Sequence, residues 1–261
     1  MRAAGLPKEK QTMNKTFDFM QQFLKDTSRA GSADTALLRK EPQPPLEVPP
    51  CPDYPNVIRL PNPEMLEDRE VGFLQMIELR ETVRQYSDAP LTLEELSFLL
   101  WCTQGVKAIL PEGRTMRTVP SARAAHAFET FLLVNNVKEL EPGLYRFLAL
   151  GHALQEIAAG GTVLDEYVDC FLPKNMIKKS GVTFIWTADF QRMAYSCGKR
   201  AVRYIYIDAG HVCQNLYLAA QQKHIGVCAI GAFDDGKLNE KLNLDGRGSF
   251  TVYCATAGKA Y

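Results

Sequence analysis

The stretch between about residues 203 and 222 constrains the fold more than any other part of this chain. It contains no charged residue between Asp208 and Lys223. Two apolar stripes recur in it at helical spacing; they consist of Ile205, Ala209, Val212, Leu216 and Ala219, and of Tyr206, Cys213 and Tyr217. A helix that is apolar on most sides is buried on most sides. We therefore expect a core helix, either within one chain or shared with a second subunit, and these residues leave both arrangements open.

Composition narrows the class of protein. The 261 residues suffice for one large domain or two small ones, and 46% of them are hydrophobic, enough for a sizeable core. Thirty basic residues balance 30 acidic ones, which gives no reason to expect a nucleic-acid partner. No apolar run approaches the roughly 20 residues that span a bilayer. Residues 1–10 lack the apolar stretch of a signal peptide, so we expect a cytoplasmic protein with no membrane segment.

Residues 1–60 differ from the rest of the chain. Residues 16–23 have apolar side chains at helical spacing and predict a short helix. The segment 41–52 that follows is rich in proline and can form neither a helix nor a central strand. We expect an extended Pro-rich arm on the surface of the body or of a partner subunit, followed by a folded domain over residues 61–261.

Local patterns in the domain predict an α+β fold. Asn62 and Pro63 indicate the start of a helix that ends near Arg80. Thr92 and Glu95 form a capping box at the start of a second helix, which ends at Gly105. Short β-rich runs bounded by turn residues predict strands at 129–134, 144–147, 182–187, 225–230 and 250–255, with a helix over 234–242. Helices and strands mix without strict alternation, which is typical of the α+β class.

The motifs of several enzyme classes are missing. The chain has no G-x-G-x-x-G after a strand, no phosphate-binding G-x-x-x-x-G-K-[ST] and no G-x-S-x-G elbow. None of the four histidines forms a close ligand pair, and we expect His211, within the apolar helix, to be a hydrogen-bonded core residue. The seven cysteines form no C-x-x-C pair and favour buried, reduced thiols over disulfides or zinc. No metal site is predicted.

Two short segments suggest the binding of a ligand with a phosphate at one end and a planar ring at the other. Arg80, Thr82 and Arg84 alternate, so an extended backbone would present two guanidinium groups and a hydroxyl on one side, as a phosphate requires. The segment Pro120–Ser121–Ala122 has little bulk and suits contact with a flat ring. A solvated charge pair and an ordinary loop are the alternative interpretations of the two segments.

Two further positions extend this pattern. Ile230 and Gly231 end a predicted strand, where a glycine lets another group approach the backbone closely. Lys259 follows the last predicted strand and could add a positive charge near a phosphate. A simple strand terminator and a solvated tail are the alternatives.

Taken in order, these segments resemble the nitroreductase family and, within it, the SagB-type or thiazoline/oxazoline oxidase-like dehydrogenases. The resemblance covers residues 60–260 and depends on six segments in the right order and spacing: 79–86, 91–96, 117–122, 141–146, 208–220 and 229–235. It implies a mainly antiparallel sheet flanked by helices, a homodimer and bound FMN.

The resemblance also implies roles for single residues. Arg80, Thr82 and Arg84 would hold the phosphate and ribityl chain, and Lys259 would return to the phosphate. Pro120, Ser121 and Ala122 would line the ring from the other subunit. Ile230 and Gly231 would face the flavin edge.

Two positions depart from the family pattern. Glu81 stands where the family usually has arginine, which places a negative charge at the expected cofactor site. Arg123 replaces a small glycine and would either cover the ring face or contact an anion or the substrate.

The expected function is that of an FMN-dependent oxidoreductase that passes two electrons through the flavin. Two substrates fit it: a nitro or quinone compound reduced with NAD(P)H, or a peptide azoline oxidised to an azole. The alternative is a non-catalytic flavin-binding or scaffold member of a modification complex, suggested by Glu81 and Arg123.

Overall fold

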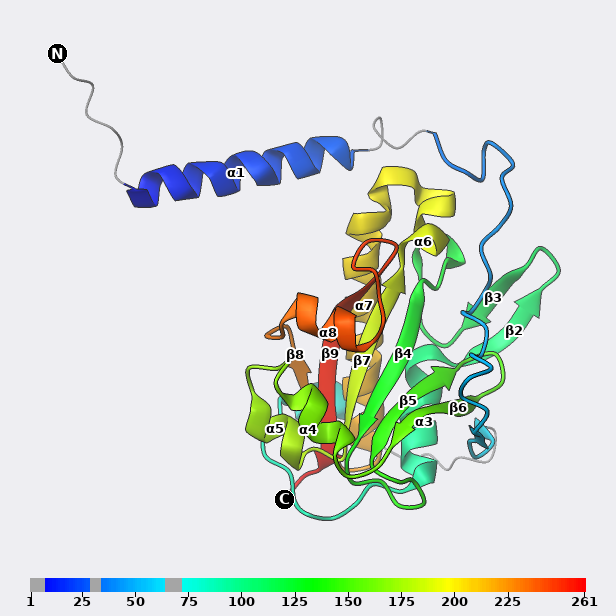
Figure 1. Ribbon diagram of the computed structural model, residues 1–261, viewed down its shortest axis with the longest axis vertical. Helices are drawn as coiled ribbons and strands as arrows, with labels where there is room; N and C mark the ends of the chain where they lie inside the picture. The colour runs from blue at the N-terminus through cyan, green and yellow to red at the C-terminus, as the bar shows by residue number, and fades with distance from the viewer. Residues whose placement is uncertain (1–7, 29–33, 64–71) are drawn as a thin grey trace.

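A seven-stranded sheet forms the centre of the molecule (Figure 1). The computed structural model describes residues 8–28, 34–63 and 72–261. The strand order is β1-β6-β5-β4-β7-β9-β8, and each of these pairings is antiparallel. The strands are β1 (Val57–Arg59), β4 (Phe128–Val134), β5 (Gly143–Leu148), β6 (Ala153–Ala159), β7 (Val182–Asp189), β8 (Ile225–Ile230) and β9 (Ser249–Lys259). A separate hairpin pairs β2 (Val106–Leu110) with β3 (Arg114–Arg117).

Helices cover the sheet, which confirms the predicted α+β class (Figure 1). They are α1 (Lys8–Asp26), α2 (Phe73–Leu79), α3 (Leu93–Gln104), α4 (Val163–Val168), α5 (Lys174–Lys179), α6 (Phe190–Cys197), α7 (Ala201–Gln222) and α8 (Asp235–Lys241), with short 3-10 turns at Ala122–Ala124 and Gly198–Arg200. In the described part of the chain, none of the helices combines the length and the apolar character that crossing a bilayer requires. All seven cysteines are free thiols, as predicted.

The five predicted strands are confirmed because their apolar residues are buried in the sheet. Phe184, Ile185 and Trp186 of β7 have no exposed surface, and they lie in the middle of the strand order. β9 continues past its predicted end at residue 255 to Lys259, pairing along its length with β7 and β8. Strands β1, β2, β3 and β6 were not predicted from their sequences.

Helix α7 is the expected core helix, and its first predicted stripe is buried throughout. The second stripe divides: Cys213 and Tyr217 are buried, whereas Tyr206 is 57% exposed. His211 is also exposed, so the prediction of a core histidine was wrong. Its neighbours four positions before and three positions after, Ile207 and Gln214, are exposed too, and together they form a surface face on an otherwise largely buried helix.

Helix caps set the boundaries of the other helices. The predicted capping box is present at α3: the Thr92 hydroxyl accepts from the Glu95 backbone, and the Glu95 carboxylate accepts from the Thr92 backbone. Asp234 caps α8 as predicted. The helix expected from Asn62 to Arg80 ends at Leu79 as α2; most of its predicted first part, residues 64–71, lies outside the described residues.

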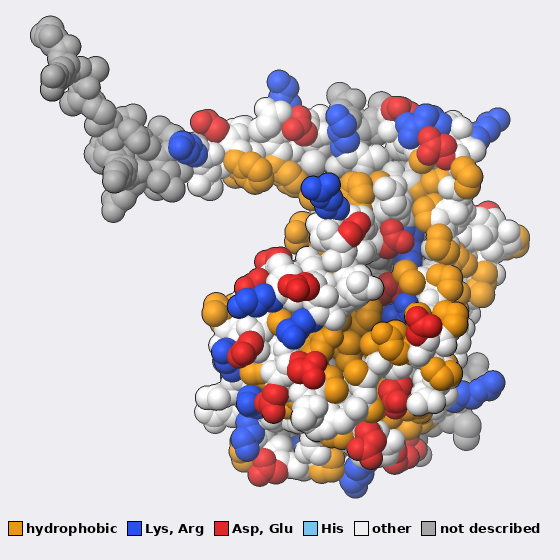
Figure 2. Space-filling view, in the orientation of Figure 1, with side chains coloured by type: hydrophobic (Ala, Val, Ile, Leu, Met, Phe, Trp, Pro, Cys, Tyr) orange, Lys and Arg blue, Asp and Glu red, His pale blue; other side chains and the backbone are white. Residues whose placement is uncertain are grey.

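Helix α1 projects away from the sheet (Figure 1) and is longer than the predicted 16–23 helix. Figure 2 shows hydrophobic side chains along the side of α1 that faces the body across an open gap. Phe17 and Phe19 are 58% and 73% exposed. The end of α1 is tied to the start of α7, because the Arg203 guanidinium donates to the Thr27 hydroxyl over 2.6 Å and lies over the ring of Phe23.

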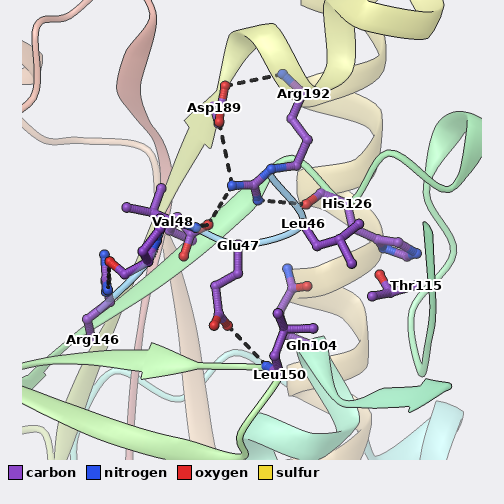
Figure 3. A network of polar contacts seen from close by, with 12 residues as sticks. Leu46, Glu47, Val48, Gln104, Thr115, His126, Arg146, Leu150, Asp189 and Arg192 are labelled. Atoms are coloured by element: carbon purple, nitrogen blue, oxygen red, sulfur yellow. Dashed lines mark hydrogen bonds and ion pairs between the residues drawn. The ribbon is translucent and has the colours of Figure 1, made fainter. Parts of the chain in front are cut away.

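The Pro-rich arm lies against the body and is held there by buried polar side chains (Figure 3). Arg117 donates to the Leu46 carbonyl over 3.3 Å, and Arg146 donates to the Pro49 carbonyl over 2.9 Å. The Val48 amide donates to Glu129 over 3.0 Å. An extended proline-rich segment cannot bond to itself, so the body supplies its partners.

A buried charge network supports this docking (Figure 3). The Arg192 guanidinium contacts Glu129 over 2.8 Å and Asp189 over 3.5 Å, and it donates to the His126 carbonyl. Glu47 of the arm accepts from the Leu150 amide over 3.1 Å, and burial raises the pKa of its carboxyl. Burial lowers the pKa of Arg117 to about 10. Buried charges of this kind require every partner to be present.

Candidate functional site

A pocket of about 970 Å³ opens at the end of β8. One wall is the strand end from Cys228 to Ala232, a second is the loop 172–176 before and at the start of α5, and a third is the segment 84–86. The volume falls at the upper end of the range for small-molecule and cofactor sites. Three of the residues predicted from sequence line this pocket: Arg84, Ile230 and Gly231.

Arg84 brings an unpaired positive charge to the pocket. Its side chain is exposed, and its guanidinium has no hydrogen bond or ion pair to any of the described residues. The two lysines in the pocket are paired instead: Lys174 contacts Asp169 over 2.6 Å, and Lys179 contacts Asp88 over 3.5 Å. A free guanidinium is a strong donor for a phosphate or carboxylate.

Gly231 leaves the backbone open at the end of β8. A Cβ atom built there meets nothing within 4 Å. The adjoining Ile230 is buried, so the strand holds this opening in place. A flat ligand could therefore lie directly against the main chain at this point.

Burial disfavours the ionised forms of two reactive groups that line the pocket. Burial raises the pKa of the Cys228 thiol, although Arg84 opposes the shift. Burial likewise raises the pKa of Tyr86, whose hydroxyl contacts the Thr256 hydroxyl over 2.8 Å. The thiol and the phenol are therefore not activated as nucleophiles by their surroundings.

Tyr217 joins the predicted phosphate segment to the pocket wall. Its hydroxyl accepts from the Ala229 amide over 2.9 Å and lies 3.4 Å from the Thr82 hydroxyl. The Arg80 guanidinium lies over its ring, 5.6 Å from the centroid. Arg80 and Thr82 thus flank β8 without lining the pocket itself. From the sequence, Tyr217 was expected only as part of an apolar stripe. The signal for its second role is that the hydroxyl of a buried tyrosine needs a hydrogen-bond partner.

The segment that contains these residues runs beside β8 and β9. The Val83 amide donates to the Val227 carbonyl, and the Ser87 amide donates to the Lys259 carbonyl, both over 2.9 Å. Glu81, between Arg80 and Thr82, is exposed and has no hydrogen bond to any residue that the structure describes. Of the three residues proposed to hold a phosphate, Arg80, Thr82 and Arg84, only Arg84 lines the pocket.

Lys259 pairs with the capping residue of α3. Its ammonium group contacts the Glu95 carboxylate, which also accepts from the Thr92 amide. The charge of Lys259 is therefore compensated within this chain, which the sequence did not reveal.

The segment Pro120–Ser121–Ala122 lies away from the pocket, against α7. The Ser121 hydroxyl donates to Asp208 over 2.6 Å, and the Ala122 amide donates to the same carboxylate over 3.3 Å. Burial raises the pKa of Asp208, and these two donors oppose the shift. Pro120 is exposed. Hydrogen bonds to α7 thus hold the inner side of the segment, and its outer side is open to another molecule.

The antiparallel sheet flanked by helices, with a pocket at the end of an edge strand, defines a nitroreductase-like α+β fold. The family model for nitroreductases matches residues 77–259. A nitroreductase-like protein of Methanocaldococcus jannaschii is 32% identical over 192 residues, which cover 72% of this chain and 89% of that protein. The chain therefore belongs to the nitroreductase family, a family of oxidoreductases.

Solved structures agree with this assignment. A nitroreductase-like protein from Anabaena variabilis has 28% identity and a TM-score of 0.59; the match covers 71% of this chain but 37% of that one. The Escherichia coli microcin synthetase complex McbBCD, with truncated pro-MccB17 bound, has 19% identity and a TM-score of 0.59 over 86% of this chain and 81% of that one. A Desulfovibrio desulfuricans nitroreductase-like protein in complex with FMN has 17% identity and a TM-score of 0.51 over 73% and 87%. The last two show the likeness of fold.

Proposed function

We propose that the protein is an FMN-dependent oxidoreductase of the SagB type, which moves two electrons between bound FMN and a small molecule or a peptide azoline. The observation that carries this proposal is the pocket at the end of β8, where the unpaired Arg84 guanidinium and the open backbone of Gly231 lie together. Support comes from the FMN complex of a protein with the same fold.

The residues present fit such a cofactor. FMN has an anionic phosphate and a planar ring, and the pocket offers a free cation and an open strand end. In this proposal Arg84 binds the phosphate from the pocket wall, and the backbone of Ile230 and Gly231 faces the ring. Arg80 and Thr82 would contribute from beside β8, outside the pocket lining, and Lys259 would exchange its contact with Glu95 for the phosphate. Bound FMN would supply the two-electron chemistry, and the chain would position the reacting groups and exclude water.

The proposal includes a second subunit. Pro120, Ser121 and Ala122 do not line the pocket of their own chain, and their outer side is open. In a homodimer they would cover the ring bound by the partner chain. Glu81 is exposed between Arg80 and Thr82, and in this proposal its carboxylate would weaken phosphate binding.

Two substrate classes remain within this proposal. Likeness in fold to the microcin synthetase complex favours a peptide azoline. A nitro or quinone compound with NAD(P)H as electron donor is the other class. Turnover of nitroaromatics with NADPH would support the nitro or quinone class. Activity restricted to a heterocyclised peptide would support the peptide azoline.

The visible absorption spectrum of the purified protein tests the cofactor. We expect the bands of oxidised flavin, release of FMN on denaturation, and bleaching on anaerobic addition of NADPH. A colourless protein that takes up no added FMN would contradict the proposal. A bound flavin that neither NADPH nor a peptide substrate reduces would instead favour the non-catalytic scaffold.

A variant of Arg84 tests the site itself. Arg84→Ala should weaken FMN binding by about 10- to 100-fold, because a hydrogen bond to a charged group is worth about 1.5–3 kcal/mol. The matched control is Arg59→Ala, an exposed arginine on β1 at the opposite edge of the sheet. Equal FMN affinity for both variants would remove Arg84 from the proposed site.

A further inference from the structure

A second pocket, of about 350 Å³, lies between the Pro-rich arm, the β2–β3 hairpin and α6. Leu37, Pro44 and Leu46 of the arm line one side of it. The arm is fixed over α6 at this point, because the Tyr195 hydroxyl donates to the Glu41 carbonyl over 3.2 Å and the Leu37 amide donates to the Tyr195 carbonyl over 2.9 Å. The pocket therefore has apolar walls that are held in place by both the arm and the body.

Arg123 lines the opposite side of this pocket with an unusual backbone. Its φ and ψ angles are 56° and 20°, in the left-handed region, which glycine adopts without strain and arginine does not. The Arg123 side chain is exposed, and it has no hydrogen bond or ion pair to the part of the chain that the structure describes. A strained position that carries an unpaired guanidinium into a pocket indicates an anionic ligand.

The other two arginines of the pocket are already engaged. Arg192 contacts Glu129 over 2.8 Å within the buried network. Arg114 contacts Glu112 over 2.6 Å at the surface. The pocket thus offers one uncompensated positive charge, which matches a single negative charge. A dianionic phosphate would leave its second negative charge uncompensated beside Glu112. The apolar walls suit a ligand whose remaining part is apolar.

We propose that this pocket binds an apolar organic acid, with its carboxylate held by Arg123. Arg123 directly follows Ser121 and Ala122, the segment that the proposed function places over the flavin of the partner chain. A substrate anchored by its carboxylate in this pocket would therefore lie beside the reacting ring. That last step rests on the proposed function, whereas binding of the acid to the pocket does not.

Equilibrium dialysis of the full-length protein with two isosteric probes tests the binding. 4-Nitrobenzoate carries the carboxylate, and 4-nitrobenzamide is its neutral counterpart. We expect the carboxylate to bind about tenfold more tightly, as a single charge-assisted hydrogen bond would give, and we expect salt to reduce the preference. Equal affinity for the two probes would overturn the proposal, as would displacement by inorganic phosphate at lower concentration than by benzoate.

Substitution of the arginine separates ligand binding from folding. Arg123→Gly removes the cation and also relieves the left-handed backbone, so the thermal midpoint should stay the same or rise while the preference for the carboxylate disappears. Arg59→Gln, at an exposed arginine that does not line this pocket, is the control and should keep the preference. A preference unchanged in Arg123→Gly would show that the residue does not hold the carboxylate.

The dialysis and the flavin spectrum test two separate proposals, and either proposal can be refuted without the other. A colourless protein that still prefers 4-nitrobenzoate would refute the proposed function and retain the pocket. A yellow protein that NADPH reduces but that lacks this preference would refute the pocket and retain the proposed function. In the active enzyme, the ratio of kcat/KM for the two probes should follow the ratio of their affinities.

Discussion

His126 is buried between two arginines, and the fold accommodates only its neutral form. Burial, followed by the charge of Arg117, lowers the pKa of its imidazole to about 3. In an unfolded chain this pKa is about 6.5. The unfolded state therefore binds a proton that the folded state does not, so stability falls as the pH drops below about 6.5 towards 3.

His126 should make the folded protein sensitive to acid. The free energy of unfolding should fall by about 2 kcal/mol between pH 7 and pH 4.5 on account of His126 alone. His126→Asn keeps a polar side chain that tolerates the positive φ of 43° but does not titrate, so its stability should vary less with pH. Urea unfolding at a series of pH values measures the difference.

The comparison of variants isolates His126 from groups that act in the opposite direction. Glu47 and Asp208 have raised pKa values in the folded protein, so each favours folding as the pH falls. Parallel curves for His126→Asn and the wild type would contradict the assignment.

At the scale of elements, the Pro-rich arm behaves as part of the folded body. Its main chain between Leu46 and Cys51 bonds to Arg117, Arg146, Glu129 and Gln155, all of which are buried. Without the arm, two of these guanidinium groups and a carboxylate would lose partners in a dry environment. Unpaired buried charge is far more costly than a missing surface contact.

Two truncations test this view of the arm. Removal of residues 1–33 should leave the thermal midpoint within a few degrees, because few of the described bonds between these residues and the body would be lost. Removal of residues 1–52 should cost about 3–5 kcal/mol or prevent folding, since buried charges lose their partners. Thermal unfolding followed by circular dichroism measures both. Equal midpoints for the two truncated proteins would show that the arm is dispensable.

The elements that could be predicted from the sequence are those with short-range causes. The capping box at Thr92 and Glu95 and the cap at Asp234 depend on residues three positions apart. Strands β4, β5, β7 and β8 are apolar runs bounded by turn residues, so their limits lie close to the predicted ones.

The features that could not be predicted join distant parts of the chain. Lys259 and Glu95 are 164 residues apart, and Thr82 and Tyr217 are 135 apart. A sequence pattern shows which face of an element is buried, but it does not show which partner a long side chain will contact. For the same reason the neutralisation of Lys259 and the docking of the arm emerged only from the structure.

At the scale of the whole molecule, the single chain leaves several apolar side chains in contact with water. Phe73 and Leu74 of α2 are 68% and 70% exposed, and Tyr206 and Ile207 form part of the exposed face of α7. In α1, Phe17 and Phe19 are also exposed. Figure 2 shows hydrophobic side chains along the side of this helix that faces the body. Grouped exposed apolar residues of this kind mark interaction surfaces in soluble proteins.

These surfaces, together with the open outer side of Pro120–Ser121–Ala122, lead us to expect a homodimer. Sedimentation velocity should show a dimer at micromolar concentration. Leu74→Glu and Ile207→Glu should each weaken it by about 100-fold or more, because a charge would be buried at the centre of an apolar interface. Leu38→Glu, on an arm residue that is 69% exposed, is the control and should leave the dimer intact. Since the proposed flavin site is completed by the partner chain, loss of the dimer should also release FMN. A wild-type protein that stays monomeric yet retains FMN would show that one chain forms the entire site.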